Sequence, residues 1–237
     1  MINLLYPAFC QACDKKTNRW DQFLCGDCLK KIKKRASPFC IKCSRRLASE
    51  VGSQDICNDC KKTVTYYDRA LSGFSYDGIL KGLVHDFKYM KMNSLAKEFA
   101  ELTLEFMKEH SMGKNIDLVL SIPMHPDRLL KREVNLSHVL AKRVARKLCV
   151  RYSSGFLKKT KNTTPQSKLK RDERIKNIKG SFSLHKNRLS EIRHKNILLV
   201  DDLFTTGATV NECARILKDA GSGYVEVITL ARGDRLE

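Results

Sequence analysis

The sequence predicts an α/β protein in which helices cover both faces of a mostly parallel sheet, preceded by a small cysteine-rich module. Short apolar runs alternate with amphipathic segments from about residue 68 onward, a pattern typical of parallel sheets. Eight cysteines precede this region in four Cys-x-x-Cys pairs. Within residues 197–219, a polar turn joins an apolar run to a helical segment. We therefore expect two units, residues 1–62 and 68–237.

The cysteine spacing predicts two structural zinc sites. The four pairs are Cys10/Cys13, Cys25/Cys28, Cys40/Cys43 and Cys57/Cys60. Each pair can turn two thiolates toward one metal, and two pairs complete a closed tetrahedral site. Short gaps favour sequential pairing, which puts the first two pairs on one zinc and the last two on the other. A cross-braced arrangement joins the first pair to the third, and thiol redox chemistry or an iron–sulfur cluster are weaker alternatives.

The composition predicts attraction to polyanions. The chain has 45 Lys and Arg against 26 Asp and Glu, a formal net charge of +19. Nucleic acid, an anionic membrane and phosphorylated ligands all fit this excess. The basic run 30–35 is either a solvated helix face or a phosphate-backbone contact. No apolar run approaches the roughly 18 residues that span a bilayer, so we expect a cytoplasmic protein without an integral membrane span.

The first half of the α/β unit is expected to hold a strand, two helices and a second strand. Residues 69–76 alternate loosely and predict an edge strand, followed by a turn and a helix over 78–89. A clearer amphipathic helix covers 94–109, with Ser94 as its N-cap. The nearly all-apolar stretch 117–122 predicts a core strand that ends in a Pro-Met-His-Pro turn.

The second half is expected to hold two helices and two strands around a basic segment. Residues 136–148 predict an amphipathic helix, and 158–179 are polar and strongly basic. After the strand and helix at 197–219, glycines at 221–223 break the helix. A last strand is predicted over 224–231.

The turn after the apolar run 197–200 has the chemistry of a phosphate cradle. Unpaired N–H groups at the following helix start carry about +0.5 of a charge, and Gly207 lets the backbone approach an oxyanion. Two adjacent acids before the turn suit a ribose. The candidate binding residues of this stretch are Asp201, Asp202, Thr205, Thr206, Gly207, Ala208 and Thr209. It is not a Walker loop, because Gly-x4-Gly-Lys-Ser/Thr is absent, and an ordinary strand-to-helix turn is the alternative.

The strand over 117–122 is expected to end near the same place. Ligands of open parallel sheets bind beyond the carboxyl ends of the strands. Both the turn at Pro123 and the turn after Asp202 lie at such ends, so we expect them to face one ligand.

The stretch 197–209 resembles the phosphoribosyl-pyrophosphate (PRPP) signature of type I phosphoribosyltransferases. With the four cysteine pairs, the whole chain resembles the ComF family of competence proteins, which share a double zinc ribbon and a phosphoribosyltransferase-like domain. The resemblance implies that the two acids face the ribose hydroxyls, that the turn holds the 5-phosphate, and that Mg²⁺ accompanies PRPP. It also places Pro123 and Met124, within Ser121–His125, beside the pyrophosphate, with Lys88 nearby.

Further residues fit the family spacing, and one stretch departs from it. The matches in and after the basic segment are Gln166, Leu169, Arg174, Asn177 and Phe182. The family element Arg-Gly-Phe-Asn-Gln reads Arg132-Glu133-Val134-Asn135-Leu136 here, so Arg132 and Asn135 are kept while the glycine is lost. The departure puts the acceptor-base side of the pocket in question.

The resemblance implies one of two functions. The first is handling of single-stranded DNA in the cytoplasm during DNA uptake, with PRPP-type binding and with a competence helicase or other DNA-processing protein as partner. The second is phosphoribose transfer to an unidentified base or amine. That chemistry would rest on positioning and charge neutralisation, so no catalytic residue is assigned. In transferases of this type a mobile loop, here 158–179, closes over the pyrophosphate; nucleic-acid binding or a solvated loop are its alternatives.

Overall fold

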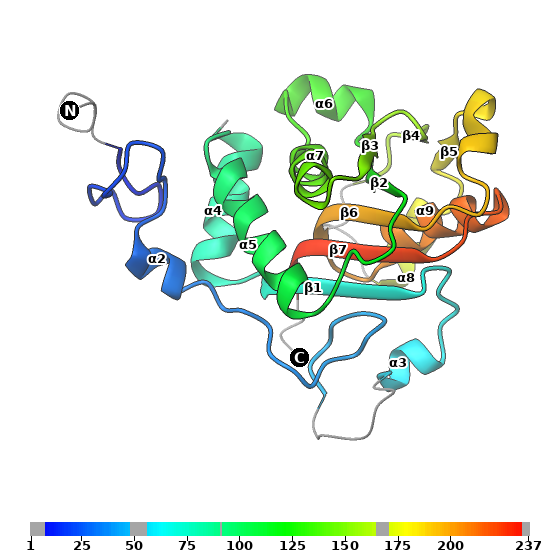
Figure 1. Ribbon diagram of the computed structural model, residues 1–237, viewed down its shortest axis with the longest axis horizontal. Helices are drawn as coiled ribbons and strands as arrows, with labels where there is room; N and C mark the ends of the chain where they lie inside the picture. The colour runs from blue at the N-terminus through cyan, green and yellow to red at the C-terminus, as the bar shows by residue number, and fades with distance from the viewer. Residues whose placement is uncertain (1–7, 48–55, 91, 165–170, 234–237) are drawn as a thin grey trace.

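The computed structural model describes residues 8–47, 56–90, 92–164 and 171–233 of the chain. Its centre is a five-stranded sheet in the order β1-β7-β6-β2-β3, with every neighbouring pair parallel (Figure 1). The predicted mostly parallel sheet is confirmed. The strands of this sheet are β1 Arg69–Ser75, β2 Leu118–Ser121, β3 Arg151–Ser153, β6 Ile197–Phe204 and β7 Val225–Arg232.

Helices cover both faces of the sheet, and a separate β4–β5 ribbon stands beside it. The helices are α2 Gly26–Lys30, α3 Asn58–Lys61, α4 Gly78–Tyr89, α5 Leu95–Glu109, α6 Pro126–Arg132, α7 Leu136–Leu148, α8 Arg171–Ile178 and α9 Ala208–Asp219, with a 3-10 helix η2 at Lys186–Glu191. The antiparallel ribbon pairs β4 Leu157–Lys159 with β5 Phe182–Leu184. Within the described ranges, no helix combines the length and apolar character that a bilayer crossing requires.

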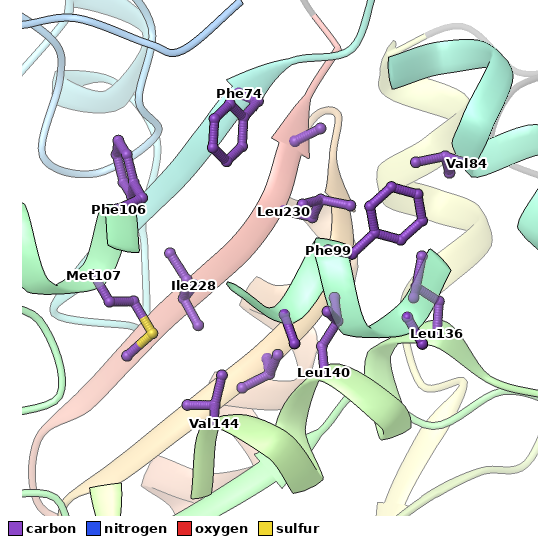
Figure 2. Close-up of a cluster of buried hydrophobic side chains, with 14 of the residues drawn as sticks. Phe74, Val84, Phe99, Phe106, Met107, Leu136, Leu140, Val144, Ile228 and Leu230 are labelled. Atoms are coloured by element: carbon purple, nitrogen blue, oxygen red, sulfur yellow. The ribbon is translucent and has the colours of Figure 1, made fainter. Parts of the chain in front are cut away.

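The alternation of side chains along β6 explains why its apolar run is continuous. Leu198 and Val200 pack toward α4, α5 and α7, whereas Ile197 and Leu199 pack toward α9. Both faces of a central parallel strand are buried, so each face needs apolar residues. Figure 2 shows the first of these two layers, in which Phe99 of α5 and Leu140 of α7 meet Leu230 of β7.

The cysteine-rich segment covers the open edge of β1. The backbone N–H groups of Arg35 and Ala70 donate across this edge to Gly73 O (3.0 Å) and Ile41 O (2.9 Å). Lys34 also forms a β-bridge with Phe74. Strand β1 is therefore the last strand of the sheet, as predicted, but the cysteine-rich segment covers its outer edge. This cover protects β1 from pairing with a strand of another chain.

Two local predictions are corrected by the structure. Ser94 precedes α5 but makes no capping bond; its hydroxyl accepts a hydrogen bond from Gln11 Nε2 at 2.6 Å. The turn after β2 leads into the unpredicted helix α6, where His125 Nδ1 accepts from the N–H of Asp127 and Pro126 takes the first helical position. His125 is thus a helix cap.

The basic segment 158–179 is not one continuous loop. It begins in β4 and ends in α8. Gln166 and Leu169 lie outside the described residues. Asn177 accepts from the N–H of Thr164 and donates to its carbonyl oxygen, at 3.3 and 2.9 Å, and so joins the last turn of α8 to the segment that follows β4.

Candidate functional site

The turn between β6 and α9 has a conformation that requires glycine. Gly207 has φ +79° and is the N-cap of α9. A Cβ added there would lie 2.6 Å from Phe204 Cζ, a distance that side chains do not tolerate. We expected glycine here only for its approach to an anion. The structure adds that the Phe204 ring fills the space against the turn.

A cavity of about 300 Å³ at the carboxyl ends of β2 and β6 brings most of the predicted binding residues together. Nine of the eleven line it: Lys88, Pro123, Met124, Arg132, Asp201, Asp202, Thr205, Gly207 and Thr209. The other two, Thr206 and Ala208, line a second, larger cavity. Thr205 and Gly207 border both cavities.

Asp201 is buried at the floor of the small cavity. Only 8% of it is exposed, and its Oδ1 accepts hydrogen bonds from Ser137 Oγ (2.7 Å) and from the N–H of Asp202 (2.9 Å). Burial, and next the charge of Asp202, raise the pKa of Asp201 to about 7. Asp201 therefore does not face solvent, although the resemblance places both acids against the ribose hydroxyls. Its buried carboxyl group also ties β6 to the start of α7.

Asp202 is held in an ion pair with Lys88 from α4. Burial alone would lower the pKa of Lys88, but the charge of Asp202 and the hydrogen bond to it raise it overall. Lys88 therefore stays protonated and places a positive charge directly beside the Asp202 carboxylate. A ligand that reaches Asp202 has to share it with this ammonium group.

Arg132 reaches the cavity rim from the end of α6. Its Nη2 donates to Tyr89 Oη at 2.7 Å, and its guanidinium lies over the Tyr89 ring, 4.8 Å from the centroid. Nearby, Asn135 donates to Ile122 O at 3.0 Å and caps α7 by accepting from the N–H of Ser137. These contacts hold the Pro123 turn and the rim in place.

The cavity residues that were not predicted from the sequence include Arg128, Ser137 and Lys159. Lys159 is only 9% exposed, its ammonium lies 5.4 Å from the centroid of the Phe182 ring, and burial, then the charge of Arg128, lower its pKa. A buried cation that faces the cavity suits an anionic ligand. The sequence Leu-Lys-Lys at 157–159 does not indicate which lysine is buried; pairing in the β4–β5 ribbon leaves Lys158 exposed and Lys159 buried.

The larger cavity, about 910 Å³, lies between the turn, α8, α9 and the segment around α3. Seven basic residues line it: Arg35, Arg45, Arg46, Arg174, Lys179, Arg215 and Arg232. Two acids also line it, and each is paired, Asp59 with Arg45 and Glu212 with Arg215. The cavity wall therefore carries a clear positive excess.

The eight cysteines form two four-sulfur clusters. One contains Cys10, Cys13, Cys25 and Cys28, the other Cys40, Cys43, Cys57 and Cys60, and the ligand atoms of each lie within 4.8 Å of one another. Sequential pairing is confirmed, and the cross-braced arrangement is excluded. The distances from Cys13 Sγ to Cys25 Sγ and from Cys43 Sγ to Cys57 Sγ are both 3.7 Å. A tetrahedral zinc site with bonds of about 2.3 Å needs sulfurs about 3.8 Å apart, so both clusters fit zinc.

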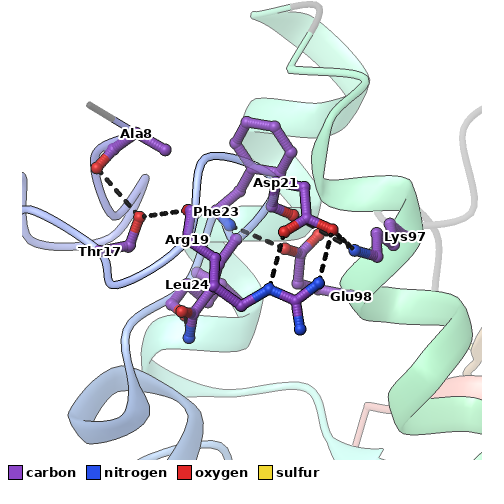
Figure 3. Close-up of polar contacts among 9 residues, drawn as sticks. Ala8, Thr17, Arg19, Asp21, Phe23, Leu24, Lys97 and Glu98 are labelled. Atoms are coloured by element: carbon purple, nitrogen blue, oxygen red, sulfur yellow. Dashed lines mark hydrogen bonds and ion pairs between the residues drawn. The ribbon is translucent and has the colours of Figure 1, made fainter. Parts of the chain in front are cut away.

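The first cluster is attached to the start of α5 (Figure 3). Glu98 Oε1 accepts from the N–H of Phe23 at 2.8 Å, and Lys97 forms an ion pair with Asp21 at 2.5 Å. Glu98 is buried, and burial raises its pKa above the ordinary glutamate value. These polar contacts hold the first cluster against a helix rather than the sheet.

The second cluster is attached to the sheet. Ser44 follows the Cys43 ligand and is buried, and its Oγ accepts from the N–H of Ser72 in β1 at 2.7 Å. Arg35 Nε donates to the carbonyl oxygen of Ser44 at 2.9 Å. Within the basic run 30–35, Lys33 pairs with Asp77 and Lys34 with Glu109, so these cations bind the protein's own acids.

Comparisons with known proteins match this two-part organisation. A family described as "Double zinc ribbon domain" matches residues 1–68, and one described as "Phosphoribosyl transferase domain" matches residues 135–237. "Competence protein F" of Haemophilus influenzae is 27% identical over 212 residues, 88% of this chain and 90% of that protein. The chain is a homologue of this protein and combines a double zinc ribbon with a phosphoribosyltransferase domain.

Two further relatives cover most of the length of this chain. "DNA utilization protein YhgH" of Salmonella typhimurium is 27% identical over 97% of the chain and 99% of that protein. "Competence protein ComFC" of Streptococcus pneumoniae is 29% identical over 90% of the chain and 89% of that protein.

The departure of this ComF homologue at Glu133 lies in a backbone conformation that favours glycine. Glu133 ends α6 with φ +62° and ψ −33°. Non-glycine residues seldom adopt positive φ. The bend after Arg132 is therefore kept although the glycine is absent.

Proposed function

We propose that this ComF homologue binds PRPP in the 300 Å³ cavity. The convergence of nine residues from α4, the turn after β2, α6, β6, the turn after β6 and the start of α9 on one small cavity carries this proposal. We also propose that the chain divides into residues 1–62 and 68–237, joined through the contacts at β1. The single-stranded DNA, Mg²⁺ and cytoplasmic assignments below belong to the same proposal.

The proposed pose follows from the charges around the cavity. The 5-phosphate lies at the N-terminus of α9, where Thr205, Gly207 and Thr209 line the cavity and the positive end of the helix dipole favours an anion. The ribose hydroxyls lie against Asp202, above the buried Asp201. The pyrophosphate extends toward Lys88 and toward Pro123, Met124 and Arg132 at the rim.

Mg²⁺ would reach this site together with PRPP. It prefers oxygen ligands and keeps several waters, so one carboxylate and the phosphates are sufficient. Asp202 supplies the nearest partly accessible carboxylate. When bound, the ion would neutralise pyrophosphate charge.

If phosphoribose transfer takes place, this chain contributes position and charge. Lys88 and Arg132 would stabilise the charge that develops on the departing pyrophosphate. Lys88 would exchange part of its contact with Asp202 for the phosphate oxygens. Tyr89 and the β4–β5 ribbon would limit access of water to the reacting carbon.

Calorimetric titration of the zinc-loaded chain with PRPP and Mg²⁺ tests the proposal. We expect saturable binding to the wild type and at least about tenfold weaker binding to Asp202→Asn, because a hydrogen bond to a charged group is lost. Asp219→Asn removes the same charge at the far end of α9 and should bind like the wild type. A pyrophosphate-release assay with a panel of bases and amines then decides between binding alone and transfer. Equal binding by all three proteins would overturn the assignment.

The larger cavity favours a second function, binding of single-stranded DNA. Its wall combines the basic excess with exposed apolar side chains, Val64, Ile175 and Tyr66, of which Tyr66 is 39% exposed. Single strands bind to positively charged grooves in which bases stack on aromatic rings. The relatives named for competence and DNA utilization support a role in DNA uptake for this chain, in the cytoplasm, where thiolates stay reduced for zinc.

Fluorescence anisotropy with a labelled oligothymidylate tests this second function. Log affinity should fall linearly with log salt, with a slope of about −0.7 for each neutralised phosphate. Arg46→Glu with Tyr66→Ala should weaken binding, whereas Lys33→Glu with Lys34→Glu changes two cations that already pair with acids and should weaken it less. Absence of binding at low salt would overturn DNA handling by the isolated chain.

A further inference from the structure

We propose that the second zinc ribbon holds the phosphate-binding turn in position through Arg232 and Phe204. The inference rests on the proposed function, because it assumes that the turn binds a phosphate. In this scheme the second zinc, and not the first, influences the conformation of the phosphate-binding turn. Arg232 is a positioning residue in this scheme, since it acts on the ligand only through the turn.

We call this series of contacts from the second zinc cluster to the turn the relay. Its first step joins the Cys40–Cys43 knuckle to the end of β7. Arg232 is 6% exposed, and its Nη1 donates to the carbonyl oxygen of Cys43. Cys43 is a ligand of the second cluster, so the position of its carbonyl group depends on the knuckle that the metal closes. Loss of the metal would therefore release the acceptor of a buried guanidinium.

The second step joins Arg232 to Phe204. The two residues are paired in the β6–β7 register, and the Arg232 guanidinium carbon lies 5.2 Å from the centroid of the Phe204 ring. The N–H of Gly233 also donates to Phe204 O at 3.0 Å. Both the ring and the backbone of Phe204 are thus held by the end of β7.

The third step joins Phe204 to the turn. The ring lies so close to Gly207 that a Cβ on Gly207 would reach 2.6 Å from Phe204 Cζ. Gly207 is the N-cap of α9, and its left-handed conformation sets the direction of the following N–H groups. A shift of the Phe204 ring would therefore move the groups that we assign to the phosphate.

The contacts of the first ribbon lead elsewhere. Gln11 donates to Ser94 and the N–H of Phe23 donates to Glu98, both at the start of α5. Neither Ser94 nor Glu98 lines the small cavity. The two ribbons thus provide an internal comparison for the proposal.

Coupling between zinc and phosphate has to be reciprocal, because both are binding equilibria of one molecule. If the second zinc stabilises the binding conformation of the turn, a bound phosphate must slow the loss of that zinc. Couplings of this kind are typically about 5- to 150-fold.

Zinc release from the wild-type chain tests this prediction. The zinc-loaded protein is exposed to a chromogenic chelator with saturating ribose 5-phosphate, or with ribose as the control. Alkylation and mass spectrometry identify the cysteines that become free. We expect ribose 5-phosphate to slow release from the cluster of Cys40, Cys43, Cys57 and Cys60 at least about fivefold and to leave the cluster of Cys10 unchanged. Equal protection of both clusters, or of neither, overturns the relay.

A substitution of Arg232 tests the same relay from its centre. Arg232→Met should weaken ribose 5-phosphate binding about tenfold and abolish the protection of the second zinc, while Arg232→Lys retains part of both. Arg188→Met is the matched control, because Arg188 also stacks on a phenylalanine, Phe156, at 4.0 Å, but lines neither cavity. A folded, zinc-loaded Arg232→Met protein that binds like the wild type overturns the relay. If this variant does not fold, the wild-type zinc-release experiment decides. A wild-type chain that does not bind ribose 5-phosphate overturns the proposed function, and the relay with it.

Discussion

The two zinc ribbons are similar in local geometry and different in what they contact. Antiparallel bridges flank both first knuckles, Phe9 with Lys16 and Phe39 with Arg46. The residue after the second cysteine has φ +57° at Asp14 and φ +56° at Ser44. The same spacing and the same metal therefore produce the same backbone twice.

The surroundings of these equivalent residues differ. Ser44 is buried and bonded to β1, whereas Asp14 is exposed. The first ribbon packs on α5, and the second covers a sheet edge and borders the larger cavity. The comparison teaches that a zinc ribbon acquires its role from the surface on which it docks.

Removal of one zinc ligand from each ribbon should give the largest contrast. Cys25→Ser and Cys57→Ser should each leave about one zinc per chain, since a structural zinc contributes on the order of 10 kcal/mol to its own module. Trp20, the single tryptophan, lies in the first ribbon and reports on it by fluorescence. Cys25→Ser should change this fluorescence and keep the thermal midpoint measured by circular dichroism. Cys57→Ser should lower that midpoint, because β1 loses its cover; equal midpoints would contradict the comparison.

The equivalent knuckle positions provide a second, smaller contrast. Ser44→Ala should lower the free energy of unfolding by about 1–3 kcal/mol, because the buried N–H of Ser72 loses its acceptor. Asp14→Ala introduces the same residue at the same φ in an exposed position and should cost clearly less. Urea denaturation of both variants measures the difference. Similar losses would show that backbone strain, and not docking, determines the effect.

Glu98 allows a test of the contact beneath the first ribbon. Its folded pKa is raised, so its contribution to stability is complete below the ordinary glutamate range and is lost as pH rises through the raised value. At pH 7 and above, Glu98→Gln removes a buried charge but keeps an acceptor for Phe23, and should stabilise the first ribbon by up to about 1 kcal/mol. Urea unfolding followed by Trp20 fluorescence at pH 6 and 8 is the measurement. A less stable variant at pH 8 would contradict this interpretation.

Surface ion pairs should not distinguish the two ribbons. Arg19 pairs with Asp21 in the first, and Arg45 pairs with Asp59 in the second. Exposed pairs contribute little because water and salt screen them. Arg19→Gln and Arg45→Gln should both leave the thermal midpoint within experimental scatter. A clear loss for Arg45→Gln alone would assign part of the second ribbon's role to this pair.

Several features of the fold could be predicted because they depend on residues close together in the chain. The helices over 78–89 and 136–148 follow from apolar residues at helical spacing. Strand β6 was predicted at the correct start, but it continues past Asp202 to Phe204. Its pairing with β7 through Asp201, Leu203 and Phe204 explains this extension, and nothing in the local sequence indicates it.

The sequence by itself determined the two four-cysteine zinc clusters and the acidic, threonine-rich turn, because ligand spacing and turn chemistry are local. Tertiary structure alone decided that Asp201 is buried beneath Ser137, that Lys159 faces the cavity and that the second ribbon covers β1. Each of these depends on residues brought together from distant parts of the chain. Burial and long-range hydrogen bonds set the charge state and position of such groups, and spacing along the sequence does not encode them.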